Sequence, residues 1–328
     1  MWEFVTDARV IHRAQQQLAR AFGGAADDRV RCFAGYQGGN HPVTALWSNK
    51  LQIWFGSRQE RYKVGRIYWN AFGANGKPHP GENKTITCEI NLGYTGRTER
   101  LAGAIAADER GRLHLMHTGR IGGGRRGIGR TLFQRHFRGE FVEVAQGVRI
   151  SQLALAGDFN SPRLAYQVAH FVREVQRIKQ LAGQAKTKKQ PTLKFSSEPE
   201  SRKGYRPSNR TIHPSADHGL VVNALEKVLT ARGLRVHNDR NRDLFVTSAN
   251  GAVQSLFEVK TSTSVGDIYQ AIGQLFYNSA TNHRKPELVL VSPRLSKMVV
   301  RLLMKLAIYH VSYTLSGSDA RFVGLSSK

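Results

Sequence analysis

The sequence predicts two folded units of different class joined by a basic linker. We expect residues 1–185 to form an α+β domain with a strongly bent, mainly antiparallel sheet, and residues 212–328 to form an α/β domain with a mixed sheet. A chain of 328 residues is long enough for two domains. Residues 186–211 are rich in Lys, Arg, Ser and Pro and lack apolar periodicity, which is typical of a flexible linker.

The first domain is expected to open and close with helices. Residues 7–24 predict one helix, and residues 161–183 predict another, because apolar residues recur there at helical spacing. Between them the sequence has segments typical of strands, at residues 51–57, 61–73, 84–94 and 101–119. In the last of these, Asp108–Gly111 separates two apolar runs and predicts a hairpin turn.

The second domain has a different order: helix, three strands, helix, strand and a final helix. Ser264 and Asp267 have the spacing of a capping box, which places the start of the middle helix. The Asn250-Gly251 pair predicts the turn between the second and third strands. The expected elements cover residues 217–233, 234–237, 243–248, 252–261, 264–280, 287–292 and 295–310. This αβββαβ core suggests a mixed sheet flanked by helices.

Charge is the unusual property of the chain. Lys and Arg number 49 against 24 Asp and Glu, which gives a net charge of +25. Such an excess usually persists because a polyanion, most often nucleic acid, neutralises it; a solubility or membrane-surface charge is the alternative. The two cysteines, Cys32 and Cys88, are too few for a disulfide framework or a zinc ribbon. With no signal-peptide or membrane-spanning pattern, we expect a cytoplasmic protein that does not bind membranes.

A segment rich in Gly and Arg, residues 117–139, predicts a nucleic-acid contact in the first domain. Glycines let the backbone approach a phosphate closely, and arginines bind phosphate in a fork or read guanine edges. The candidate contacts are Arg120, Arg125, Arg126, Arg130 and Arg135. Aromatic residues of this domain offer either stacking walls for a flipped or modified base or ordinary core; they are Trp47, Trp54, Tyr68 and Trp69.

Three residues of the second domain carry the chemistry. Glu258 and Lys260 are two positions apart on one strand, so they project to the same side while Val259 turns into the core. Asp243 opens the preceding strand, which the turn can bring back beside Glu258. Two converging carboxylates suit a hard cation such as Mg²⁺, with Mn²⁺ as a substitute, and the lysine can orient or deprotonate a water. We expect Asp243 and Glu258 to be the metal ligands.

This segment, residues 212–295, resembles the PD-(D/E)xK nuclease superfamily, which has the restriction-endonuclease-like fold. The resemblance assigns the aspartate of the motif to Asp243 and its ExK element to Glu258 and Lys260. It implies a Mg²⁺-dependent DNA endonuclease, in which hydrolysis of the phosphodiester leaves a 5′-phosphate.

The resemblance extends to the two helices that flank the motif. It assigns a catalytic glutamate to Glu226 on the preceding helix and a catalytic glutamine to Gln274 on the following one. Two departures stand out: Arg242 replaces the proline of the motif, and Tyr277 follows Gln274 by three residues where four are usual.

The whole layout is similar to that of modification-dependent restriction enzymes. It implies that the first domain reads sequence or modified bases in double-stranded DNA, in defence or else in repair or recombination, and cutting both strands would favour a homodimer. Two alternatives stay open. One is a non-catalytic nucleic-acid-binding protein with a silent nuclease fold, and the other is an RNA-directed nuclease, because phosphate contacts are common to DNA and RNA.

Overall fold

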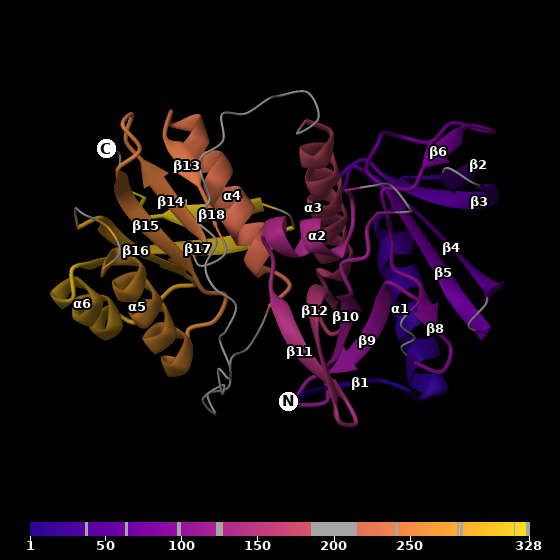
Figure 1. The fold of residues 1–328 in the computed structure, drawn as a ribbon, viewed down its shortest axis with the longest axis horizontal. Helices are drawn as coiled ribbons and strands as arrows, with labels where there is room; N and C mark the ends of the chain where they lie inside the picture. The colour runs from indigo at the N-terminus through magenta and orange to yellow at the C-terminus, as the bar shows by residue number, and fades with distance from the viewer. Residues whose placement is uncertain are drawn as a thin grey trace.

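The computed structural model describes residues 1–328 apart from residues 37–38, 63–64, 97–99, 123–126, 185–214, 240–241, 281, 283–284, 318 and 326–328. The predicted linker therefore lies outside the described residues. Within them the chain is a mixed α/β protein with six helices and three sheets (Figure 1). We call residues 1–184 the N-terminal part and residues 215–325 the C-terminal part.

The N-terminal part contains a closed barrel and a separate sheet, where the sequence predicts one bent sheet. The barrel has the order β1-β11-β12-β10-β9, and the second sheet has the order β6-β2-β3-β4-β5-β7, with β8 also on β5. The barrel strands are β1 (Trp2–Phe4), β9 (Gly103–Ala107), β10 (Leu113–His117), β11 (Phe141–Gln146) and β12 (Arg149–Asp158). The others are β2 (Asp28–Tyr36), β3 (Gly39–Ser48), β4 (Ile53–Tyr62), β5 (Gly65–Gly73), β6 (Asn83–Thr85), β7 (Cys88–Glu89) and β8 (Leu92–Gly93).

The three helices of this part are α1 (Ala8–Ala25), α2 (Arg130–His136) and α3 (Leu164–Gln184). Asp7 caps α1 by accepting hydrogen bonds from the amides of Arg9 (2.7 Å) and Val10 (3.1 Å), so the predicted start is confirmed. The apolar stripe of α1 joins the core that α3 and the second sheet share. In that core the ring of Phe22 lies 4.8 Å from the ring of Phe55.

The C-terminal part is one six-stranded mixed sheet covered on both faces. Its order follows the chain, β13-β14-β15-β16-β17-β18, with parallel pairing from β15 to β17 and antiparallel pairing elsewhere. Helix α4 packs on one face, and α5 and α6 pack on the other. The elements are α4 (His218–Ala231), β13 (Arg235–His237), β14 (Leu244–Thr247), β15 (Val253–Val259), α5 (Val265–Ala280), β16 (Glu287–Ser292), α6 (Lys297–Lys305), β17 (Ile308–Ser316) and β18 (Asp319–Val323).

The predicted αβββαβ order is present, but the expected final helix, residues 295–310, is too long. Helix α6 ends at Lys305, and Ala307 adopts a φ of 56°, which a right-handed helix does not allow. Ile308 then begins β17, which pairs with β16 and places Ile308 and Val311 in the core. The chain therefore turns back into the sheet where the sequence predicts helix.

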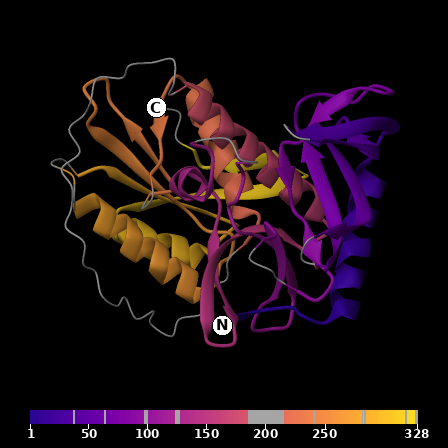
Figure 2. The ribbon, with the colours of Figure 1, turned by 45° about the vertical axis from the view of Figure 1, so that its right-hand side comes forward.

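The two parts meet along α3 and α4, which run close together (Figure 2). The side-chain amide of Gln167 donates to Asp217 (3.1 Å), and that of Asn223 donates to Glu174 (3.1 Å).

Among the described residues, no helix combines the length and the apolar composition needed to cross a membrane.

The predicted turn at Asp108–Gly111 is confirmed. Gly111 has a φ of +73°, and Asp108 accepts hydrogen bonds from the amides of Arg110 and Arg112, both at 2.9 Å. Burial opposes ionisation, but the hydrogen bonds from Arg112, His114 and Arg110 outweigh it and lower the pKa of Asp108 to about 2.

We predict that Asp108→Asn lowers the free energy of unfolding by about 1–2 kcal/mol at pH 7, because the ionised carboxylate accepts more strongly than an amide. Since the folded-state pKa is depressed, the wild-type advantage is complete above pH 4 and decreases as the pH falls toward 2. About half of it should remain at pH 3. Urea denaturation of both proteins at pH 7 and pH 3 measures this, and an advantage equal at both pH values would contradict it.

Candidate active site

Strand register brings the predicted carboxylates together. Leu244 pairs with Phe257 in the antiparallel β14–β15 ladder, so Asp243, one residue before β14, lies opposite Glu258. Val259 is fully buried in the core shared with α4, as the alternation predicts. Asp243 and Glu258 therefore lie opposite each other at the end of these strands, as the sequence predicts.

Lys260 is held in place by several contacts. Its ammonium donates to Oε1 of Glu258 (2.7 Å) and to Oε1 of Gln274 on α5 (2.8 Å). Its backbone amide donates to the carbonyl of Val291 (2.8 Å), and its carbonyl accepts from the hydroxyl of Tyr313 (3.3 Å). The side chains of Lys260 and Glu258 are only 14% and 4% exposed. The ammonium of Lys260 is thus largely shielded from solvent and fixed in position.

Asp243 is held from two sides. Its Oδ2 accepts from the amide of Val259 (2.8 Å), and its Oδ1 pairs with Nε2 of His218 (3.2 Å) at the start of α4. Nδ1 of His218 lies 3.5 Å from Oε1 of Glu140, which belongs to the N-terminal part, and Oε2 of Glu140 accepts from the amide of Ser215 (3.0 Å). A chain of charged groups therefore connects the two parts through the candidate site.

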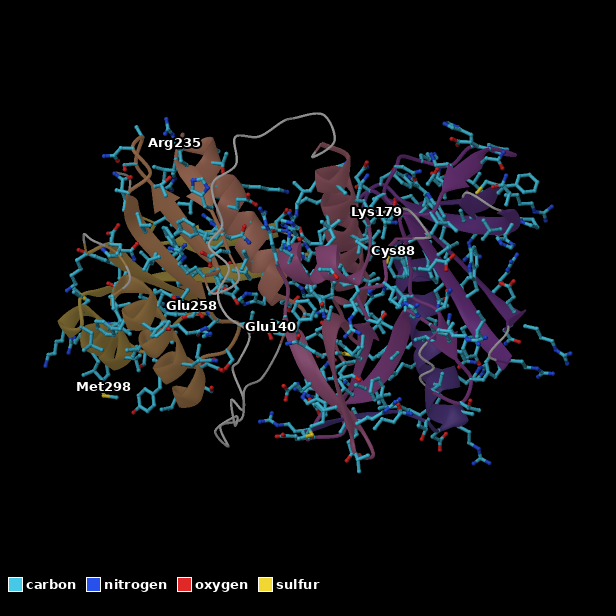
Figure 3. The ribbon with its side chains drawn as sticks, viewed as in Figure 1. Cys88, Glu140, Lys179, Arg235, Glu258 and Met298 are labelled. Atoms are coloured by element: carbon cyan, nitrogen blue, oxygen red, sulfur yellow. The ribbon has the colours of Figure 1, made fainter. Side chains whose placement is uncertain are left out.

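The pKa values follow from burial and from this chain of charges. Burial opposes the charge on His218, but Asp243 and Glu140 outweigh it and raise its pKa to about 9. Burial also opposes the charge on Asp243, yet the imidazolium of His218 keeps the pKa of Asp243 below its usual value. Burial and the nearby Asp243 together raise the pKa of Glu258 to about 7. Figure 3 labels Glu258 and Glu140 in the region where the two parts meet.

The two carboxylates fit a divalent cation. They are the hard oxygen ligands that Mg²⁺ prefers, and the effect of Asp243 on the pKa of Glu258 reflects a repulsion that such a cation relieves. Within the part of the chain that the structure describes, no three His, Cys, Asp or Glu side chains form a complete metal site. The other positions would be filled by water and phosphate oxygens, as is usual for Mg²⁺.

A cleft of about 860 Å³ opens at Asp243, and both parts line it. His218, Asp243 and Gln274 come from the C-terminal part. Helix α2 and the segment after it line the opposite side. Four arginines contribute to the lining: Arg135, Arg138, Arg177 and Arg242. The cleft is therefore suited to an anionic chain that reaches Asp243.

The structure places only some of the predicted nucleic-acid contacts at this cleft. Arg135 lines it, whereas Arg120 and Arg130 are exposed but do not line it. Arg125 and Arg126 lie outside the described residues. The four aromatic residues considered as stacking walls are all buried, between 0% and 4% exposed, and therefore form core: Trp47, Trp54, Tyr68 and Trp69.

Glu226 and Tyr277 do not lie with Asp243, Glu258, Lys260 and Gln274. Glu226 pairs with Nη1 of Arg138 (2.6 Å) and lines a different cavity from the one over Asp243. The side chain of Tyr277 is 73% exposed. Sequence reasoning instead missed His218 and Glu140. The sequence signal for His218 was its place just after Asp217 at the start of the predicted helix, beside the strand ends where Asp243 lies; no local pattern marks Glu140.

Comparisons with known proteins add little. No family model matches the sequence, and no curated protein matches it. A solved structure, the crystal structure of a repair endonuclease from Pyrococcus abyssi, aligns over 94% of this chain and 96% of that chain, with 10% identity and a TM-score of 0.23. A TM-score this low does not show a shared fold.

We predict that the Arg138–Glu226 pair couples the two parts. In a double-mutant cycle with Arg138→Ala and Glu226→Ala, the coupling free energy measured by urea unfolding should be about 0.5–1 kcal/mol. The exposed pair Lys77–Asp28, at 2.7 Å, provides a matched control whose coupling should be near zero. Equal couplings for the two pairs would show that the interface position of Arg138 adds nothing.

Proposed function

We propose that this chain is a Mg²⁺-dependent DNA endonuclease whose active site is formed by Asp243, Glu258, Lys260 and Gln274. The observation that supports it most is the buried arrangement in which Lys260 bonds both Glu258 and Gln274 while Asp243 lies opposite Glu258. A surface ion pair would be exposed and worth little, whereas Glu258 and Lys260 are 4% and 14% exposed, and Asp243 and Gln274 beside them line an arginine-rich cleft.

In this proposal Asp243 and Glu258 hold Mg²⁺, or Mn²⁺ in its place, which would supply a Lewis acid for the scissile phosphate and a more acidic water. The ammonium of Lys260 stabilises the negative charge that develops on phosphorus, because it is fixed before the reaction begins. Glu258 and Gln274 accept hydrogen bonds from two of the three N–H donors of Lys260, so the third is left to orient the attacking water, and Gln274 orients Lys260.

The bond changes are those of phosphodiester hydrolysis. The water oxygen forms a bond to phosphorus, and the bond from phosphorus to the 3′ oxygen breaks. The water loses a proton to solvent and the 3′ oxygen gains one, which leaves a 3′-hydroxyl and a 5′-phosphate. No other reactant is needed.

We assign DNA positioning to the arginines of the cleft and of α2. Their forked donors match phosphate oxygens, and the net charge of +25 favours a polyanion over long range. Defence against foreign or base-modified DNA is the biological role we propose first, with the N-terminal part as reader. The burial of its tryptophans removes one candidate pocket for a flipped base, so base reading would have to use other residues.

We predict that Asp243→Asn and Lys260→Ala each reduce DNA cleavage at least about 100-fold, because each removes a group from the reacting centre. The assay uses purified protein with Mg²⁺ or Mn²⁺ on duplex and single-stranded DNA, with and without base modification, and on RNA of the same sequence. The matched controls are Glu287→Gln and Lys285→Ala, exposed residues near the start of β16, and both should cut like wild type.

The outcomes separate the alternatives. Cleavage that is lost in both site variants and kept in both controls supports the proposal, and the substrate that is cut identifies what the chain reads. Cutting of RNA but not DNA would replace the DNA assignment. If all five proteins bind DNA equally and none cuts, the chain is a binding protein with a silent site.

A further inference from the structure

The candidate catalytic groups lie deep between two walls. Asp243 lines the cleft and is 21% exposed, whereas Glu258 and Lys260 are recessed behind it and are 4% and 14% exposed. A phosphate must therefore enter the space between the two parts to approach these groups. The phosphates of an intact duplex are held on a rigid helix, whereas those of a single strand can follow a curved path into such a space.

The walls of the cleft are connected to each other by polar contacts. Arg138 pairs with Glu226 at 2.6 Å, and Glu140 approaches His218 at 3.5 Å. The hydrogen bonds between α3 and α4 add to these contacts. Moving the two walls apart would break these partly buried pairs, so the contacts favour the narrow form of the cleft.

A second cavity, of about 620 Å³, lies next to the first along the boundary between the parts. Arg138 and Arg177 line both cavities, so the two are neighbours. Five cationic and three acidic side chains line the second cavity. Two of the acids already have partners, because Glu174 pairs with Arg177 (2.8 Å) and Glu226 with Arg138.

The remaining charges of the second cavity favour an anion. Lys50, Arg173 and Lys227 are left to face one carboxylate, that of Asp319. Arg173 donates to the carbonyl of Leu51 (2.5 Å), and a guanidinium has five N–H donors, so most remain for another acceptor. Two further polar atoms on the wall are buried and have no hydrogen-bond partner among the described residues: Nε2 of His170 and Oδ1 of Asn223. Such atoms are usually satisfied by water or a ligand.

We propose that the substrate is single-stranded where it meets the site, and that the strand runs between the two parts with its flanking phosphates in the second cavity. The claim that the strand is cut at Asp243 rests on the proposed function, whereas the path of the strand does not. A single strand is flexible enough to enter the cleft, and its phosphates match the cationic surplus. The duplex that the family resemblance implies would have to be open at this point, as in a gap, a flap or an unwound end.

The first experiment measures binding of the full chain without divalent cation, so that it does not depend on cleavage. Fluorescence anisotropy compares a single-stranded oligonucleotide with a hairpin duplex of the same sequence at 150 mM salt. We expect the single strand to bind at least tenfold more tightly. Equal or tighter binding of the duplex would overturn the proposal.

The second experiment locates the strand in the second cavity. The double variant Lys50→Gln/Lys227→Gln removes two exposed cations at its rim, and Lys297→Gln/Lys305→Gln removes two exposed cations from α6 as a matched control. For the cavity variant, the slope of log affinity against log salt should decrease by about 1.4 for the single strand. The control variant should keep the wild-type slope. Equal slopes in the two double variants would refute the path through the second cavity.

Cleavage assays then distinguish this proposal from the proposed function. With active enzyme, the cavity variant should raise KM for single strands about five- to twentyfold with kcat within twofold of wild type, and the control should change neither. Faster cutting of intact duplex than of single strands overturns the single-strand proposal and leaves the nuclease standing. If no substrate is cut, the proposed nuclease fails, and the binding experiments still decide where the strand lies.

Discussion

The gathering of three carboxylates in one place, one buried and two partly buried, determines much of this structure. Asp243, Glu258 and Glu140 all lie where the two parts meet, and each would be costly to bury without a compensating charge. Lys260 and His218 supply that compensation from opposite sides. Because His218 contacts both a C-terminal and an N-terminal carboxylate, the neutralisation of the site and the docking of the two parts depend on the same side chain.

The sequence predicts those parts of the site whose residues lie close together along the chain. The Asp243, Glu258 and Lys260 arrangement follows from strand alternation and one short turn, so local rules were sufficient. Glu140 approaches the site from another sheet, and no periodicity links it to residues so far along the chain. Glu226 shows the opposite failure: its helix was predicted, but the facing Arg138 belongs to the N-terminal part and pairs with it instead.

The errors in the fold have a similar origin. Between Lys297 and His310, apolar residues recur at helical spacing and also at strand spacing, so the sequence does not show where the helix ends. The end of the helix is set by the pairing of β17 with β16. In the N-terminal part, the expected bent sheet is replaced because the short strand β1 pairs parallel with β11 and antiparallel with β9, and so closes the barrel. Three residues with little pattern of their own thus change the architecture.

This closure has a consequence for how the protein folds. Trp2 of β1 pairs with Val144 of β11, and a contact between residues so distant in sequence slows folding because a long stretch of chain must first be brought together. Glu140 directly precedes β11, so it reaches its final position only when the barrel closes. The contact between Glu140 and His218, and with it part of the docking of the two parts, therefore forms only after the barrel has closed.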